Sequence, residues 1–176
     1  MLLMSMKIGW VIAFAVIVSL LVCFYYCCYI GKKKSIDEKL VECLKPSIKY
    51  FSGSMNALMA VAKDPDFTFA DNTFTNISQI VSIKCDEKVK EWYSVLEKDR
   101  IAWNLSQYSK KAQEVLIILK KCGVQSYKES VINWGNSYSA KYNKLKAVSD
   151  GQECEVVDPY WLYNGQVFEK GLVRPK

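Results

Sequence analysis

The 176-residue chain contains no histidine. Serine–histidine–aspartate triads, cysteine–histidine pairs and two-histidine iron sites all require imidazole, so the composition excludes them. The sequence also lacks a Cys-x-x-Cys pair and a Ser-x-x-Lys motif, which are the usual signals of dithiol redox centres, zinc knuckles and lysine-activated serine nucleophiles. We therefore predict no catalytic residue, no metal site and no cofactor, and we expect that the protein is not an enzyme.

Most of the chain lacks an excess of basic over acidic residues. The sequence carries 24 Lys and Arg against 18 Asp and Glu, and four of the lysines are Lys7 and Lys32–Lys34. Taking these four away leaves 20 basic residues, which nearly balance the 18 acidic ones. Because a nucleic-acid-binding module normally concentrates basic charge in one stripe, we expect no nucleic-acid partner.

One long hydrophobic run is present, because Gly9–Ile30 contains no charged residue. As a helix, this run extends about 33 Å, which is enough to cross a hydrocarbon core of about 30 Å. Residues that suit a membrane interface lie at its ends, namely Trp10, Tyr25, Tyr26, Tyr29, Lys32, Lys33 and Lys34. We predict an N-terminal tail at 1–8, a transmembrane anchor at 9–30 and a basic juxtamembrane collar at 31–34 that contacts membrane lipids.

Two other interpretations of this run are weaker. A cleavable signal peptide has an apolar region of about 7–15 residues and an Ala-x-Ala-like exit. Here the run is longer, and Ala13-Phe14-Ala15 falls inside it. A lipobox ending at Cys23 would carry Val22 where a small residue is expected. The sequence thus favours an uncleaved anchor and a single-pass membrane protein.

The side of the membrane on which the remaining chain lies is ambiguous in the sequence. The lysines after the span favour a cytoplasmic domain by the positive-inside rule. Four cysteines outside the span favour export, because an even set in a small domain is typical of two disulfides. We predict an extracytoplasmic domain, with the cytoplasmic topology as the alternative.

The region 35–150 is expected to form a helical bundle. Ser35 and Glu38 form a capping box that starts a helix, and apolar residues then recur every three or four positions, with a bend at Pro46. The predicted apolar stripes cover 36–62, 76–122 with a break at 104–106, and 126–148, with a loop at 63–74. Stripes of this kind bury against one another in an antiparallel three- or four-helix bundle or coiled coil.

The region 151–176 is expected to form a short C-terminal β-hairpin or tail. Asn164-Gly165 separates Trp161–Tyr163 from Gln166–Phe168, and this dipeptide favours a type I′ turn. The predicted fold class is therefore mainly α, with an N-terminal transmembrane helix, a helical bundle and this hairpin.

Helix length restricts the disulfides that Cys43, Cys85, Cys122 and Cys154 can form. The predicted helix between Cys122 and Cys154 would hold them about 34 Å apart, whereas a bridge tolerates about 6 Å between Cα atoms. We expect Cys85 to pair with Cys154 and Cys43 with Cys122, while the other connectivities stay open.

Aromatic residues are the best candidates for contact with a partner. In the predicted last helix they fit either the core or a docking face, whereas those of the terminal hairpin follow the bundle and suit an exposed contact. The candidates are Tyr127, Trp134, Tyr138, Tyr160, Trp161, Tyr163 and Phe168.

These observations favour a membrane-anchored helical interaction or scaffold protein that acts by protein contact at the membrane. Its partner would be another membrane or envelope protein, or a second copy of itself, in an envelope, secretion, entry, lysis or immunity assembly. The alternatives are a histidine-free enzyme that uses carboxylates or a thiol such as Cys43 or Cys85, and a peripheral helical domain that binds lipid beside Lys32–Lys34.

Overall fold

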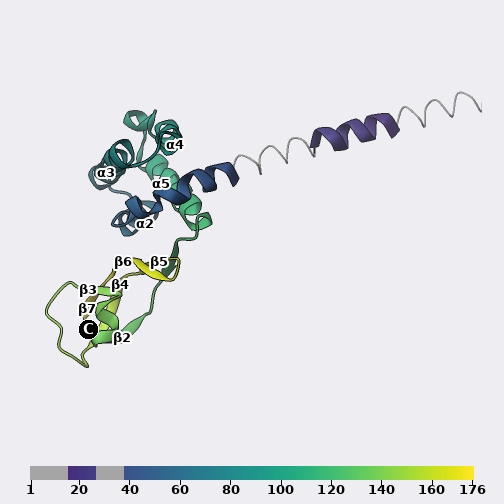
Figure 1. The fold of residues 1–176 in the computed structure, drawn as a ribbon. Coiled ribbons are helices and arrows are strands. Elements are labelled where there is room, and N and C mark those ends of the chain that lie inside the picture. Colours follow the sequence, from purple (N-terminus) through teal and green to yellow (C-terminus); the bar gives the residue numbers. More distant parts are fainter. Residues whose placement is uncertain (1–15, 27–37) are drawn as a thin grey trace, which may run out of the picture. The chain divides into compact units, whose positions relative to one another are not determined.

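The computed structural model of the chain describes residues 16–26 and 38–176. The chain divides into two units, residues 1–40 and residues 41–176 (Figure 1). The described part of the first unit contains a helix over residues 16–26, whose side chains are all exposed. A second helix, over residues 38–44, leads into the larger unit.

The structure contradicts the predicted transmembrane anchor. Within residues 16–26 and 38–176, no helix has both the length and the apolar character needed to cross a membrane. The helical residues 16–26 cover part of the predicted span. They include two of the predicted interface residues, Tyr25 and Tyr26. The rest of the predicted span and the other interface residues, Trp10, Tyr29, Lys32, Lys33 and Lys34, lie outside the described residues.

The first half of the larger unit is helical. Its elements are η1 Lys45–Phe51, α2 Met55–Lys63, α3 Phe67–Lys84, α4 Glu87–Glu97, η2 Arg100–Ala102 and α5 Leu105–Lys121. Most of the loop predicted at 63–74 is helical, because the carboxylate of Asp66 accepts a hydrogen bond from the Phe69 N–H and starts α3. The carboxylate of Asp86 starts α4 in the same way, and Asn104 with Gln107 forms a capping box on α5. The predicted helical stretch at 76–122 therefore consists of the end of α3 followed by α4, η2 and α5.

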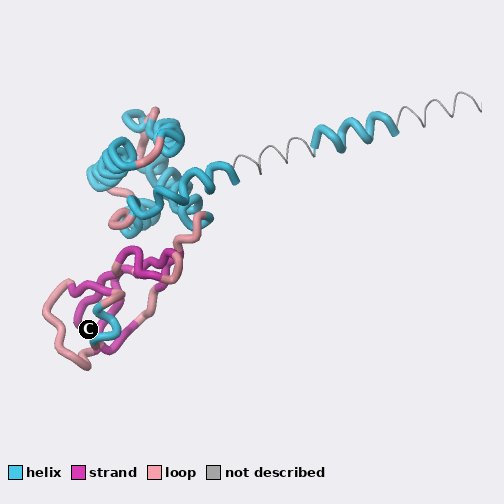
Figure 2. Tube along the Cα trace, viewed as in Figure 1, coloured by secondary structure: helices cyan, strands magenta, loops and turns pink. Residues whose placement is uncertain are grey.

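The second half of the larger unit consists mainly of strands (Figure 2). Its elements are β1 Gln125–Tyr127, β2 Val131–Asn133, α6 Asn136–Ser139, β3 Tyr142–Lys144, β4 Glu153–Asp158, β5 Tyr160–Tyr163, β6 Gln166–Glu169 and β7 Gly171–Pro175. They form two sheets, ordered β1-β5-β6 and β2-β4-β7-β3. The β3–β7 pair is parallel and the other pairs are antiparallel.

The predicted helix at 126–148 is wrong, and with it the mainly helical fold class. In the segment that contains β2, Ile132 and Trp134 are buried while Val131 and Asn133 are exposed. This alternation with a period of two is that of a strand with one face on a core. The expected hairpin is present as β5 and β6, but it belongs to a seven-strand region with its own apolar core. That core contains Ile132, Trp134, Tyr142, Val148, Cys154, Val156, Tyr160 and Val173.

The predicted disulfides are also absent among the described residues, where Cys23, Cys43, Cys85, Cys122 and Cys154 are all free thiols. Cys154 lies in the core of the strand region, whereas Cys85 ends α3 and Cys122 ends α5. The expected Cys85–Cys154 bridge required the helix at 126–148 to fold back along its predecessor, and that helix does not form. Burial raises the pKa of Cys85, Cys122 and Cys154, which keeps them in the thiol form.

One carboxylate joins the strands to the helices. Glu169, at the end of β6, accepts hydrogen bonds from the backbone N–H groups of Gly53, Met55 and Asn56, at 2.8, 2.8 and 2.9 Å. These groups lie at the start of α2, where N–H donors lack intrahelical partners. Burial raises the pKa of Glu169, and the three N–H donors lower it in part.

Asn56 adds a second link between the same elements. Its side-chain nitrogen donates to the carbonyl of Pro159 at 3.1 Å, and its oxygen accepts from the indole N–H of Trp161 at 2.7 Å. We refer to Glu169, Asn56 and Trp161 as the clamp. Because the clamp satisfies both backbone and indole donors, it fixes β5 and β6 against α2.

Candidate functional site: an apolar groove between two helices

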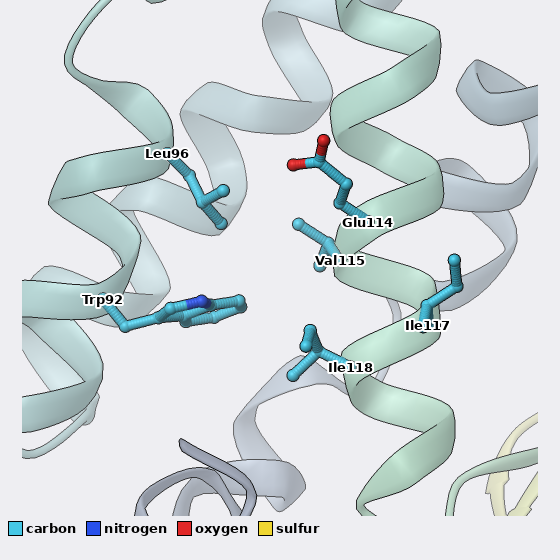
Figure 3. A pocket seen from close by; sticks show the side chains of 6 residues that line it. All are labelled: Trp92, Leu96, Glu114, Val115, Ile117 and Ile118. Carbon is cyan, nitrogen blue, oxygen red and sulfur yellow. The ribbon is translucent and has the colours of Figure 1, made fainter. Parts of the chain in front are cut away.

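An apolar groove of about 240 Å³ lies between α4 and α5. Its lining residues are Trp92, Leu96, Glu114, Val115, Ile117 and Ile118. Figure 3 shows Trp92 and Leu96 on α4 facing Val115 and Ile118 on α5, with the carboxylate of Glu114 beside them. The groove is therefore formed by side chains from two neighbouring helices.

The sequence of α5 places apolar side chains outside the core. Residues 115–119 are five consecutive apolar residues, and at about 100° per residue they surround the helix. Val115, Leu116 and Leu119 are buried, whereas Ile117 is 53% exposed. A helix of this kind has a second apolar surface beside its core stripe.

The sequence of α4 has the same property. Val89 and Tyr93 are buried in the core. Trp92 and Leu96 lie on the adjoining face and are only half-buried. Trp92 packs edge-on against Tyr93, with ring centroids 6.2 Å apart. Because Tyr93 is buried in the core, this contact holds the Trp92 side chain in place as one wall of the groove.

The size and lining of the groove suit side chains better than a small substrate. Small-molecule sites usually measure about 300–1,000 Å³ and contain several convergent polar groups. Here the polar lining residue is Glu114, and its carboxylate is bonded to the ammonium group of Lys111 at 2.8 Å. The groove has room for two or three apolar side chains, and it has few polar groups that could orient a polar ligand.

Several of the predicted contact aromatics have structural contacts instead. Trp134, Tyr160 and Trp161 are buried, and Trp161 belongs to the clamp. Tyr163 and Phe168 are half-buried and pack against each other across the hairpin, with centroids 6.1 Å apart. The hairpin thus uses most of its aromatic surface within the molecule.

The structure brings the three predicted tyrosines Tyr127, Tyr138 and Tyr160 into one cluster, together with Tyr142. Tyr127 stacks on Tyr160 at 5.7 Å, and Tyr142 meets Tyr160 edge-on at 5.3 Å and Tyr138 at 6.3 Å. The ammonium group of Lys141 lies 5.3 Å from the Tyr160 centroid and 5.8 Å from that of Tyr138. Of the four tyrosines, Tyr127 is the most exposed, at 44%, so the cluster offers a small outer surface.

The hydroxyl group of Tyr142 is the polar end of this cluster. It is buried and has no hydrogen-bond partner of normal geometry among the described residues, although the Glu129 backbone lies near it. Burial, and then the Glu129 carboxylate, raise the pKa of Tyr142 to about 12. At neutral pH the group is therefore an uncharged part of the core.

Acidic residues of the helical half are held in a network with Arg100. The guanidinium group of Arg100 bonds to the carboxylates of Asp71 and Glu97, and the Tyr108 hydroxyl donates to Asp71 at 3.1 Å. Burial, and then Asp71, raise the pKa of Tyr108. This network links α3, η2 and α5, and it gives the two carboxylates a structural use.

Cys85, one of the two thiols named for the enzyme alternative, lies in surroundings that do not activate it. Cys85 is buried, which raises its pKa, whereas reactive cysteines have lowered values and partial exposure. Cys43 is half-buried and lines an opening together with Glu42, Pro46, Asp86, Glu87 and Lys88.

The sequence did not predict the groove, because Trp92 and Leu96 fall within the apolar stripe expected at 76–122 and their spacing fits a core face. The signal that identifies it is the apolar run at 115–119, which is wider than a single core face. No protein-family model, no curated protein and no solved structure matches this chain.

Proposed function

We propose that the protein is a non-enzymatic interaction protein that holds a partner protein in the groove between α4 and α5. The observation that carries this proposal is the half-exposed apolar wall formed by Trp92, Leu96 and Ile118. Tryptophan is the residue type most enriched among the side chains that dominate binding energy at protein interfaces.

Further exposed apolar residues on the same helices support the proposal. Val95 is 72% exposed and lies on α4 between Trp92 and Leu96, and Ile117 is 53% exposed on α5. Val95 is three residues from Trp92 on α4 and so lies on the neighbouring part of the helix surface, and Ile117 lines the groove itself. A surface of this form suits apolar side chains inserted by a partner, with the outer residues excluding water around them.

Site-specific photocrosslinking tests the proposal. A photoreactive phenylalanine analogue placed at position 117, at the groove, is expected to give discrete crosslinked products in the native cell. The matched control carries the same analogue at position 83, because Ile83 is 78% exposed on α3 and does not line the groove. Products from position 117 that disappear with Ile118→Asp support the proposal. The absence of any product at position 117, or equal products from both positions, contradicts it.

A further inference from the structure

The exposed face of α4 carries opposite charges at its two ends. Lys88 lies in the first turn of the helix, and Asp99 comes directly after its last turn. Lys98 still has helical backbone angles, with φ −49° and ψ −40°, so Asp99 continues the helical path. At about 100° per residue, positions 88 and 99 lie within about 20° of each other around the axis and about 16 Å apart along it.

Apolar side chains lie between these two charges. Trp92 and Val95 are four and seven residues after Lys88, so they share its face of the helix. Val95 is 72% exposed, and Trp92 is half-buried and forms one wall of the groove. We refer to Lys88, Trp92, Val95 and Asp99 as the α4 stripe. Along its length the stripe is basic, then apolar, then acidic.

The charged ends of the α4 stripe have no ion-pair partner within residues 16–26 and 38–176. Lys88 and Asp99 are both exposed, and the Asp99 side chain does not cap the helical turn that follows it. Lys90 differs, because its ammonium group is bonded to the carboxylate of Glu87 at 2.8 Å. The two ends of the stripe are therefore available to charges of opposite sign on another molecule.

We infer that the protein held at the groove is a second copy of this chain, whose α4 packs antiparallel against α4 across a two-fold axis. This inference rests on the proposed function and specifies the partner. A two-fold interface joins the same patch of both copies, so the patch has to complement itself. With the axis between Trp92 and Val95, Lys88 meets the partner's Asp99 and Trp92 meets the partner's Val95. The partner's α4 then covers the half-exposed wall of the groove.

The charges favour the antiparallel direction. A parallel two-fold pair would place Lys88 beside the partner's Lys88 and Asp99 beside the partner's Asp99, and like charges in contact are unfavourable. Glu91 and Lys98, which are exposed and seven residues apart on one flank of the α4 stripe, also exchange across the axis in the antiparallel pair. Both sets of charges thus select the same direction.

The other wall of the groove lacks this pattern. The exposed charges of α5 include Lys110 near its beginning and Lys120 near its end. An antiparallel pair of α5 helices would bring its basic ends together. The self-complementary element is therefore α4, and α5 lies beside the axis.

Zero-length crosslinking of the full chain tests the inference. A water-soluble carbodiimide joins a carboxylate to an amine in contact with it, with loss of one water molecule. Because Lys88 and Asp99 of one chain are about 16 Å apart, an amide between these positions forms between two copies. We expect this crosslink in peptide maps of the dimer, joining light and heavy chains in an isotopically mixed sample. A crosslinked dimer without it overturns the inference.

Charge reversal tests the direction. Lys88→Glu or Asp99→Lys alone should raise the dimer dissociation constant roughly tenfold in analytical ultracentrifugation, because each creates two like-charge contacts per dimer. The double variant should return to within about threefold of the wild type, since it restores both pairs with the signs exchanged. Lys146→Glu is the control, because it makes the same charge change at an exposed position between β3 and β4. Dimers that the double variant does not restore overturn the antiparallel pair.

Val95→Asp tests the apolar middle of the α4 stripe without disturbing the core, because Val95 is 72% exposed. It should abolish the dimer, whereas Ile83→Asp, at a 78% exposed position of α3, should not. Dimers that persist in Val95→Asp use another surface and overturn the inference. A monomeric chain that still gives crosslinked products from position 117 overturns the inference and leaves the proposed function standing. A monomeric chain without such products contradicts both.

Discussion

The helical and strand halves of the larger unit use their aromatic residues differently. Trp161, in the strands, is buried and donates its indole N–H to Asn56. Trp92, in the helices, is half-buried at the surface and lines an open groove. Two tryptophans in one unit thus differ in their surroundings: one holds the fold together, and the other lines a groove at the surface. Exposure and hydrogen-bond partners distinguish them, whereas residue type does not.

The strongest test of this comparison is to truncate each tryptophan in turn. Trp161→Ala should lower the free energy of unfolding by about 3–5 kcal/mol, because it leaves a large cavity and an unpaired Asn56 oxygen. Trp92→Ala should lower it by no more than about 1.5 kcal/mol, because its side chain is already partly in water. Denaturant unfolding followed by far-ultraviolet circular dichroism measures both. Equal losses for the two variants would remove the distinction between the halves.

The next test concerns the junction between the halves. Glu169→Ala should cost about 2–4 kcal/mol, because three backbone N–H groups at the start of α2 lose their common acceptor. Glu153→Ala is the control, because this exposed carboxylate also lies in a strand but bonds only at the surface, to Lys176. Unfolding curves of the two variants should differ clearly. A Glu169→Ala protein as stable as the control would mean that the clamp does not hold the halves together.

Local signals in the sequence were sufficient to predict some of these elements. Asn164-Gly165 predicted the β5–β6 hairpin correctly, because a type I′ turn needs two residues with positive φ, and these have φ values of 51° and 76°. Such a turn depends on adjacent residues alone. The buried face of α5, with Tyr108, Ala112 and Val115, likewise followed from spacing within one helix.

Non-local pairing explains the main failure in the fold. Tyr127, Val131, Trp134, Tyr138 and Tyr142 recur at helical spacing, and the sequence therefore favoured a helix. In the structure Val131–Asn133 pairs with residues of β4 that are 20 to 24 positions away, which a local pattern does not reveal. The β-branched pair Val131-Ile132 was the available contrary signal.

The candidate site was harder to predict than the fold. Trp92 and Leu96 follow the stripe of the core residues Val89 and Tyr93 so closely that spacing alone assigns all four to one face. Which of them faces the groove depends on where α5 lies relative to α4, and the spacing within α4 does not reveal this. The anchor predicted at 9–30 is contradicted on a different ground: within residues 16–26 and 38–176, no helix combines the length and the apolar character needed to cross a membrane.

A smaller effect concerns the tyrosine cluster in the strand half at high pH. Unfolded tyrosine loses its proton near pH 10, whereas burial holds the pKa of Tyr142 at about 12. The folded protein therefore retains this proton longer, and its stability should fall as the pH rises from 10 to 12. Tyr142→Phe should lessen that fall and leave stability at pH 7 equal or higher, because the hydroxyl has no good partner. Parallel pH slopes for the two proteins would contradict the assigned environment.

The smallest expected effect on stability is at the groove, where the effect on binding should be largest. Ile117→Lys should change the free energy of unfolding by less than about 0.5 kcal/mol, because the side chain is 53% exposed and lysine is a good helix former. It should nevertheless weaken association at the groove, measured by analytical ultracentrifugation, since it adds a charge where apolar contact is expected. Leu116→Lys is the instructive contrast, because this neighbour is 7% exposed and its substitution should unfold the protein before any binding is measured. If the Ile117→Lys protein is stable and associates as the wild type does, the apolar surface at the groove does not take part in binding a partner.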